Sequence, residues 1–506
     1  MSTSKAQLQQ WLRHPAPETN LVERIRESSG TPIILEALRQ AAPDLTHIEP
    51  MTYTLYRQFE QTGEREGYEQ RYFRRRAQLT RAVLETISGN TSLRDSIHDL
   101  LWSICEETSW VMPAHEEQGP DYWDIDPPIK RTTPLGAHTS LTREPDSIDL
   151  FAAETGASLA ETIHWIGGDL APEVVQRVRQ EIQRRIFKPY LAYAREHWWF
   201  QGALNWNGVC NGAVGLAFMR LEHDLATLTE ALEMVLEGFE TYIATGFEQD
   251  GGSVEGVGYW RYGLMYYVTL GELLHERTAG QLDLLDTERM RSIAAYPRVM
   301  YLSPGNFANF GDANEDASLA PGITQRIAKR TGVDELRALI NRDRPIDKAS
   351  ASAAKLAITL RNAAWWDGQT VEPLPLQDAF LPHCEVAKMV GQSNAGQPIA
   401  LIATAGNNDG HHSHTDVGSF ILHVDGESLI CEIGRGRYSR EYFRQSRYET
   451  PFTNSFGHSL PRIGGHLQSP GPEFNGHKQF YGTIVEHDFN TADKYVTIDM
   501  QNAYDV

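Results

Sequence analysis

The chain has 506 residues, of which 41% are hydrophobic, and its formal net charge is −21. This much apolar material can form a large core and more than one domain, so an intrinsically disordered chain is excluded. The acidic balance argues against a surface that attracts nucleic acid or anionic membrane as a whole, and we expect neither as a partner.

The start of the chain has no basic segment followed by an apolar run, and no apolar stretch is long enough to cross a bilayer. We therefore expect a cytoplasmic protein, or a periplasmic one if a leader has been removed. Cys105, Cys210, Cys384 and Cys431 are far apart and form no CxxC pair, which indicates neither a disulfide framework nor a cysteine zinc site. The sequence does not indicate an oligomeric state.

The first two thirds of the chain have a helical apolar pattern. Val174, Val178, Ile182 and Ile186 recur at four-residue steps after a proline suited to a first helical turn. Helix following helix through short connections predicts stacked helical hairpins, in a bundle, a solenoid or a closed toroid. Helices are predicted over or near 34–42, 69–88, 93–107, 150–166, 171–187, 209–223, 225–243, 262–279, 287–299 and 323–341.

The pattern changes after residue 366. Residues 367–384 contain three prolines and little periodicity, which predicts an interdomain linker. Beyond it, short runs of β-branched and aromatic residues separated by Gly, Asp or Asn predict an antiparallel β region. We thus divide the chain into a helical domain over 1–366, a linker over 367–384 and an antiparallel β domain over 385–506. No closing segment follows the last predicted strand, so we expect this β domain to be incomplete at its C-terminal end or unusually small.

The segment 406–434 has the richest concentration of groups able to bind a metal or move a proton. On extended backbone His412, His414 and Asp416 share one face. A hairpin with its turn at an Asp-Gly pair would return Glu432 alongside them.

Together with His458, these side chains form a plausible set of nitrogen and oxygen ligands for zinc. Side chains two apart on a flat strand diverge by about 6–7 Å, so two of them rarely bind one metal without a bulge. One histidine could therefore bind metal while the other serves a cleft. The alternative is that they are hydrogen-bonded structural histidines.

Three asparagines lie within seven residues at the start of a predicted apolar helix. Asn205 or Asn207 could be its N-cap. Amide side chains at a helix N-terminus could also help to neutralise a substrate carboxylate, because the backbone there carries a partial positive charge. The third asparagine of this set is Asn211.

A glycine-rich segment around Glu255 leads into Tyr259, Trp260 and Tyr262 at the start of another helix. Aromatic side chains at this position usually pack in the core. A sugar-binding cleft also needs flat apolar faces with polar tips, which Tyr and Trp provide.

The segment 435–448 is rich in arginine and aromatic residues and contains no lysine. Arginine forks suit carboxylates and sulfates, and neighbouring aromatic rings suit sugar faces. The simpler interpretation is a loop whose arginines pair with Glu441 and Glu449. Candidate substrate-binding residues in this segment are Arg437, Tyr438, Arg440 and Tyr442.

Six motifs in order give the sequence a resemblance to the heparinase II/III-like polysaccharide lyases, which include alginate and oligoalginate lyases as well as heparin and heparan sulfate lyases. The motifs are ICEETSWVMPAH at 104–115, NWNGVCNGAVGLA at 205–217, EGVGYWRYG at 255–263, NFGDA at 309–313, HSHTDVGSFILHVDGE at 412–427 and NSFGHS at 454–459. The resemblance implies an N-terminal (α/α) toroid joined to antiparallel, sandwich-like β-sheets, with the active site between them.

The resemblance also implies β-elimination at a uronic acid, which yields an unsaturated sugar. Such an enzyme neutralises the uronate carboxylate, removes the adjacent C5 proton and protonates the departing glycosidic oxygen. Tyr259 would be the general acid, and the role of base is also open to it. Asn205 or Asn207, together with His412, would address the carboxylate or share the base role, and Asn211, Glu255, Trp260 and Tyr262 would lie along the substrate.

A structural zinc is implied at positions His414, Glu432 and His458. The chain departs from the family at Glu432, where aspartate is usual, and at Trp206, where several relatives carry histidine. The predicted partner is an acidic polysaccharide or oligosaccharide, and the missing leader favours an exo-acting enzyme on imported oligosaccharides.

Two other functions are compatible with these residues. A glycoside hydrolase on a helical toroid would need two carboxylates flanking the cleft, and the candidates are Asp250, Glu255 and Asp312. A glycan-binding or regulatory protein would use the same groove without turnover. Formation of a conjugated double bond would separate elimination from both.

Overall fold

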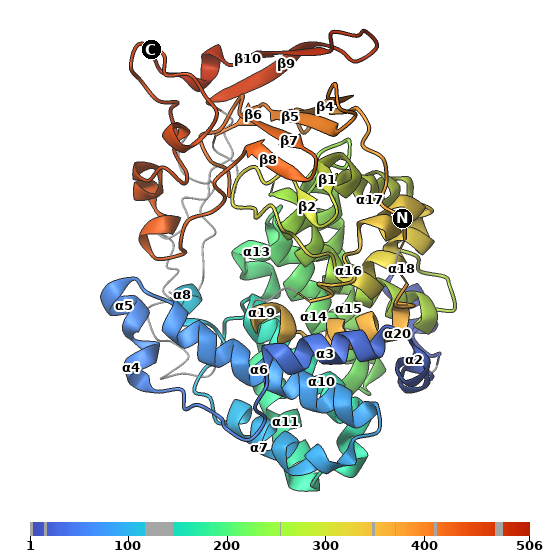
Figure 1. Ribbon diagram of the computed structural model, residues 1–506. Coiled ribbons are helices and arrows are strands. Elements are labelled where there is room, and N and C mark those ends of the chain that lie inside the picture. Colours follow the sequence, from blue (N-terminus) through green and yellow to red (C-terminus); the bar gives the residue numbers. More distant parts are fainter. Residues whose placement is uncertain are drawn as a thin grey trace.

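The computed structural model describes residues 4–14, 18–116, 145–253, 255–346, 350–369, 371–408, 412–470 and 479–506. Figure 1 shows helices over the first part of the chain and the larger sheets of the last part packed against one end of them. The order of helices followed by antiparallel strands is therefore confirmed. Among the described residues, no helix is long and apolar enough to span a membrane.

Three helices form the centre of the helical part: α10 (Leu150–Ile166), α14 (Asn205–Leu221) and α16 (Gly256–Arg277). Every residue of α14 is buried, as its apolar composition on all sides requires. Gly212 allows α16 to come close, because a Cβ there would lie 2.9 Å from the carbonyl oxygen of Tyr266. This close packing fixes the starts of α14 and α16 relative to each other.

The other helices surround this centre. They are α1 (Lys5–Trp11), α2 (Leu21–Glu27), α3 (Thr31–Ala41), α4 (Tyr53–Tyr56), α5 (Gln58–Thr62), α6 (Glu66–Ile87), α7 (Arg94–Cys105), α8 (Pro113–Glu116), α11 (Pro172–Ile182), α12 (Lys188–Tyr193), α13 (Trp198–Gln201), α15 (Leu225–Thr245), α17 (Glu288–Met300), α18 (Pro321–Thr331), α19 (Ser350–Ala353) and α20 (Leu356–Trp365). Each predicted helix overlaps one of these, although the last predicted one is shorter and is followed by a 3-10 turn over Asp334–Leu339.

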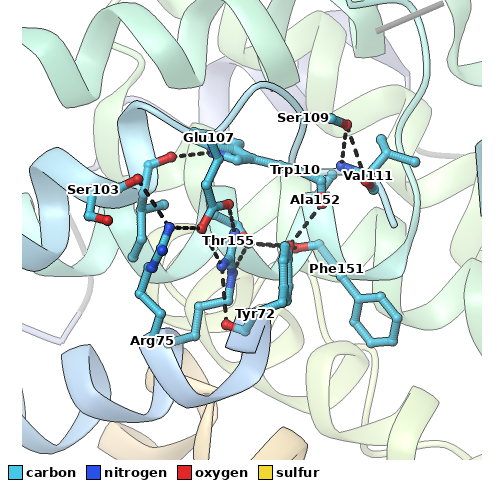
Figure 2. A network of polar contacts seen from close by, with 12 residues as sticks. Tyr72, Arg75, Ser103, Glu107, Ser109, Trp110, Val111, Phe151, Ala152 and Thr155 are labelled. Carbon is cyan, nitrogen blue, oxygen red and sulfur yellow. Dashed lines mark hydrogen bonds and ion pairs between the residues drawn. The ribbon is translucent and has the colours of Figure 1, made fainter. Parts of the chain in front are cut away.

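A buried polar network joins α6 to the end of α7 and to α10 (Figure 2). The Glu107 carboxylate accepts from Arg75 at 2.7 Å and from Arg76 at 3.0 and 2.7 Å. The Tyr72 hydroxyl donates to the carbonyls of Trp110 and Phe151. Because this network is removed from solvent, each charge depends on its partner for compensation.

In the described part of the chain the strands form three antiparallel sheets. The five-stranded sheet has the order β3-β4-β5-β7-β8, and the three-stranded sheet has the order β10-β9-β6. The short hairpin β1-β2 lies beside them at the junction with the helices (Figure 1). The bounds are β1 (Tyr301–Ser303), β2 (Asn306–Phe307), β3 (Ala379–Leu381), β4 (Val386–Gln392), β5 (Pro398–Thr404), β6 (Gly406–Asn407), β7 (Phe420–Val424), β8 (Glu427–Ile430), β9 (Tyr481–Asp488) and β10 (Tyr495–Asp499).

The predicted hairpin between β7 and β8 is confirmed. Asp425 and Gly426 both have positive φ, at 52° and 90°, as a tight two-residue hairpin turn requires. Strand β8 ends at Ile430, so Glu432 follows the strand instead of lying within it. Strand β3 lies inside the segment predicted as a linker and pairs with β4.

One buried lysine ties the five-stranded sheet to the helical part. Lys388 on β4 donates from Nζ to the carbonyls of Arg298 on α17 and Tyr301 on β1, each at 3.1 Å. The residue is 1% exposed. Burial and the charge of Arg298 lower the pKa of Lys388 from 10.5 to about 7.

Candidate active site

A cavity of about 920 Å³ lies between the helices and the loops that connect the strands. Its volume falls in the range of small-ligand sites. The helical side comes from α6, α8, α10, α14, α16 and α19, and the opposite side from loops that include Asp312, His412 and Arg435. Lining residues used below are Arg65, His115, Asn205, Trp206, Tyr259, Tyr262, Asp312, Lys355, His412, Arg435, Arg437 and Tyr438.

Tyr259 and His412 form the centre of one wall. Their rings stack with centroids 4.4 Å apart and an interplanar angle of 16°. The Tyr259 hydroxyl lies 2.5 Å from the hydroxyl of Tyr438. Burial and the charge of Asp312 raise the pKa of Tyr259 above its ordinary value, so the phenol is protonated near neutral pH.

The backbone around His412 differs from the extended segment that we predicted. His412 has a positive φ of 59°, and no strand is assigned between residues 412 and 416. The expectation that His412, His414 and Asp416 share one strand face is therefore wrong. The physical reason is that this segment lacks the alternating apolar residues that would hold it in a sheet.

Asp312 lies directly behind the two histidines. Its carboxylate accepts from His412 Nδ1 at 2.8 Å and from His414 Nε2 at 2.9 Å. Tyr438, Tyr442 and Arg447 also donate to it. Burial raises the pKa of Asp312, but Arg447 and the histidine hydrogen bonds outweigh burial and hold that pKa well below its ordinary value.

The asparagines have different environments. Asn205 is the first residue of α14 and lines the cavity, where its amide nitrogen donates to Glu255 at 3.1 Å and its buried Oδ1 has no partner among the described residues. Asn207 Nδ2 donates to the Phe200 carbonyl, and its Oδ1 accepts from Asn211. Leu204 occupies the N-cap position, so neither Asn205 nor Asn207 is the N-cap.

Asn207 and Asn211 are fully buried, and the cavity lining does not include them. Asn211 Oδ1 accepts from the Tyr190 hydroxyl at 2.6 Å, which completes a chain of buried amides beneath α14. Burial raises the pKa of Glu255, and the cavity histidine and Asn205 oppose that effect. Asn205 is thus the member of the NWN motif that reaches the cavity.

The arginines of segment 435–447 separate into different roles. Arg437 pairs with Glu64 at 2.5 Å and with Glu66 at 2.9 Å, and Arg440 contacts the carbonyl and ring of Phe59. Arg435 lines the cavity, is exposed, and lies 4.4 Å from the centroid of the Tyr438 ring.

Within the described part of the chain, Arg435 forms no ion pair, so its guanidinium can receive an anion. The interpretation that these arginines pair with Glu441 and Glu449 is wrong for Arg437, whose partners are Glu64 and Glu66. Arg435 was not singled out from the sequence, because the arginine spacing does not show which of them meets a glutamate.

The aromatic candidates also separate. Tyr262 and Tyr438 line the cavity, whereas Trp260 is 2% exposed and its indole donates to the Ile293 carbonyl in the core. The Tyr442 hydroxyl is directed to Asp312. Trp206 lines the cavity beside His115, with ring centroids 4.9 Å apart.

Three further cavity residues were not predicted as site residues, and these are Arg65, His115 and Lys355. His115 Nδ1 lies 2.6 Å from Asp149, and its Nε2 lies 3.4 Å from Arg65. Lys355 pairs with Glu154 at 2.6 Å. His115 belongs to the quoted motif 104–115, which was the available signal for it.

A group suited to a metal ion lies behind Asp312. The group consists of His414, Asp416 and His458. Each residue offers one potential ligand atom, these atoms lie within 4.8 Å of one another, and all three residues are buried. His414 Nδ1 and His458 Nε2 are buried without hydrogen-bond partners in the described structure. Two imidazole lone pairs and a carboxylate match the ligand types of zinc, so the residues present fit the metal.

Glu432, predicted as a ligand, contacts His458 Nδ1 and the hydroxyl of Ser419. In this arrangement it orients the His458 ring from behind, which is a common position for a carboxylate next to a metal-binding histidine. Burial lowers the pKa of His458, but the hydrogen bond to Glu432 outweighs it, so the net shift is upward.

A helical part followed by antiparallel sheets has the architecture of the heparinase-like polysaccharide lyase fold. The solved structures agree. A heparinase III structure superimposes with a TM-score of 0.58 at 12% identity, covering 99% of this chain and 71% of that one. A second heparinase III structure gives a TM-score of 0.50 at 11% identity, covering 97% of this chain and 76% of that one.

Comparisons with protein-family models and with curated protein sequences find no match. At such low identity the structural likeness shows the fold, and the resemblance drawn from the six motifs is confirmed at that level.

Proposed function

We propose that this protein is a polysaccharide lyase that cleaves a uronate-containing glycan by β-elimination. The observation that carries the proposal is the stacked pair of Tyr259 and His412 facing a cavity that also contains Asn205 and the unpaired Arg435. These groups can neutralise a carboxylate, remove a proton and supply a proton within one site. The heparinase III fold supports the same class of reaction.

Arg435 and Asn205 are proposed to hold the uronate carboxylate. An exposed guanidinium without an ion-pair partner can form two parallel hydrogen bonds to it. The Asn205 amide nitrogen donates to Glu255 and its buried Oδ1 has no partner in the described structure, so the amide can turn toward a bound carboxylate. Neutralising the carboxylate makes the C5 proton more acidic, which is the difficult step of the reaction.

The proton transfers are then assigned to His412 and Tyr259. His412 Nε2 takes the C5 proton, the electron pair forms the C4–C5 double bond, and the C4–O4 bond breaks. Tyr259 donates its phenolic proton to O4, consistent with its raised pKa. Solvent returns both groups to their starting protonation states.

A zinc ion is proposed to be held by His414, Asp416 and His458, with Glu432 orienting His458. When bound it would supply structural charge compensation below the cavity. The residues themselves contribute by fixing the segment that carries His412. The proposed ligands are two histidines and one acid, with Asp416 in place of the expected Glu432, because a carboxylate oxygen of Asp416 lies within 4.8 Å of a ring nitrogen of each histidine.

The finer architecture and mode of action are also proposed. We infer an (α/α) toroid and a sandwich-like arrangement of the sheets, as in the resembling family. Arg437 pairs with Glu64 and Glu66 and so joins the loop side of the cavity to the helical side, and we propose that this contact limits passage of a continuous chain. This favours exo action on an acidic oligosaccharide, including alginate-type uronates.

The three carboxylates considered for hydrolysis are occupied. Asp250 accepts from the backbone N–H groups of His383 and Cys384 and does not line the cavity. Asp312 accepts from five side chains, and Glu255 is engaged by Asn205. A hydrolytic pair is therefore less well supported than elimination.

The test is ultraviolet absorbance of the conjugated double bond during incubation with alginate, heparan, chondroitin, hyaluronan and ulvan oligosaccharides. Tyr259→Phe should lower kcat by about 10²–10⁴-fold with a small change in KM. Tyr193→Phe, at an exposed site outside the cavity lining, is the matched control. Undiminished absorbance in Tyr259→Phe would refute the role of the phenol.

A second pair of variants tests the carboxylate site. Arg435→Ala should raise KM, because it removes the guanidinium proposed to hold the carboxylate. Arg437→Ala should change the free energy of unfolding by less than about 1 kcal/mol, because the ion pairs of Arg437 are exposed. New reducing ends without absorbance would establish a hydrolase, and binding without turnover would establish a glycan-binding protein. Early release of only unsaturated monosaccharide would support exo action, and a mixture of sizes would refute it.

A further inference from the structure

A single carboxylate lies between two histidines that have separate tasks. Asp312 contacts His412 through Nδ1 and His414 through Nε2, so the two rings present opposite nitrogens to it. We infer that Asp312 is a positioning residue that sets the tautomers of both histidines, preparing one imidazole for the cavity and the other for a metal ion. This inference deepens the proposed function and, for the cavity histidine, rests on it.

The hydrogen-bond inventory leads to this assignment. An ionised carboxylate only accepts hydrogen bonds, so an imidazole nitrogen in contact with it must carry the proton. In the neutral rings His412 is then protonated on Nδ1 and His414 on Nε2. The lone pairs lie on the opposite nitrogens, Nε2 of His412 and Nδ1 of His414.

The lone pair of His414 faces the proposed metal site, and the lone pair of His412 faces the cavity. His414 Nδ1 is buried without a hydrogen-bond partner in the described structure, and its residue belongs to the group with Asp416 and His458. His412 lines the cavity, and its Nε2 lies 3.8 Å from Glu255. Two histidines separated by one residue can thus serve different sites.

Asp312 also fixes the backbone of the histidine segment. Its own N–H donates to the carbonyl of His412 at 3.0 Å. The preceding Gly311 has φ 66°, and a Cβ there would lie 2.8 Å from the same carbonyl oxygen. The segment 311–312 therefore restrains the peptide plane that follows His412, while the carboxylate orients its ring.

The substitution Asp312→Asn separates this role from simple packing. An amide has one acceptor oxygen and one donor nitrogen, so it cannot accept from both imidazoles in the wild-type manner. At least one histidine must then change its tautomer or lose its hydrogen bond. Asp312→Glu keeps an acceptor-only group and is the conservative comparison.

The experiment measures histidine tautomers by ¹⁵N NMR in the metal-free full chain, with signals assigned by His412→Gln and His414→Gln. We expect Nδ1–H for His412 and Nε2–H for His414 in the wild type, and loss of at least one in Asp312→Asn. Zinc affinity of that variant should fall about 10–100-fold. In Asp312→Glu both tautomers should be retained.

Kinetics adds a second readout on the same variants. In Asp312→Asn kcat should fall by roughly 10²–10⁴-fold with KM nearly unchanged, because proton transfer and not substrate binding is affected. The opposite tautomer of either histidine in the wild type, or unchanged tautomers in a folded Asp312→Asn, would overturn the inference. If no glycan is cleaved, the proposed function fails while the tautomer and zinc results still decide the inference.

Discussion

The buried Lys388 should make the stability of this protein depend on pH in a way that one substitution removes. The pKa of Lys388 is lowered from 10.5 to about 7 by burial and by the nearby Arg298. Asp378 opposes this shift. A difference of about 3.5 pH units corresponds to about 5 kcal/mol.

The sign follows from the protons bound by each state. Between about pH 7 and pH 10.5 the native lysine is mainly neutral while the unfolded lysine is protonated, so unfolding takes up a proton and stability rises with pH. Below about pH 7 both states are protonated, and the cost of the buried charge is present in full. From about pH 6 to pH 8.5 this lysine alone should add about 2 kcal/mol to the free energy of unfolding.

Lys388→Met removes that contribution while keeping an unbranched apolar side chain. The variant also loses the hydrogen bonds to the carbonyls of Arg298 and Tyr301, which lowers stability by an amount that does not depend on pH. The free-energy difference between variant and wild type should therefore shift against the variant by about 2 kcal/mol as pH rises over that interval.

Urea denaturation at several pH values, followed by circular dichroism, measures this shift. Lys5→Met is the matched control, because the Lys5 side chain is 58% exposed and should give a difference that is independent of pH. A constant difference between Lys388→Met and wild type would show that the buried lysine titrates normally and would refute the reasoning.

Three other substitutions follow from the packing and the metal site. Glu107→Gln leaves two buried guanidinium groups without their carboxylate and should lower the free energy of unfolding by about 3–5 kcal/mol in urea denaturation; a loss below 1 kcal/mol would contradict the network. Gly238→Ala places a Cβ against the side-chain amide of Asn211, which is held by hydrogen bonds, and should lower the free energy of unfolding by about 1–3 kcal/mol in the same assay. His414→Ala should lower zinc content and melting temperature together, whereas full metal retention by mass spectrometry would refute its role as a ligand.

Long helices were predictable from the sequence because their buried apolar residues recur at the period of the α-helix. In helix α11 the predicted stripe is confirmed, because Val174, Val178 and Ile182 are buried. The hairpin β1-β2 was not predicted, because strands of three and two residues are too short to display a period. The turn between β7 and β8 was predictable because an Asp-Gly pair tolerates the positive φ that the turn needs.

The composition of the site was predictable, but the role of each side chain depends on contacts between distant segments. Arg437 is paired and Arg435 is available because Glu64 and Glu66 come from the helical part, more than 300 residues earlier. Asp312 was considered only as a hydrolytic acid, since nothing in its spacing shows that five donors converge on it. These assignments required the folded structure.

The positive φ of His412 means that a residue proposed for catalysis lowers the stability of the folded protein. A non-glycine residue in this conformation costs on the order of 1–3 kcal/mol, and glycine would relieve that cost. His412→Gly would also remove the imidazole that faces the cavity. Selection for heat resistance alone would therefore favour replacement of His412, whereas selection for turnover would preserve it. Thermostable variants of this protein would have to be chosen by activity as well as by melting temperature.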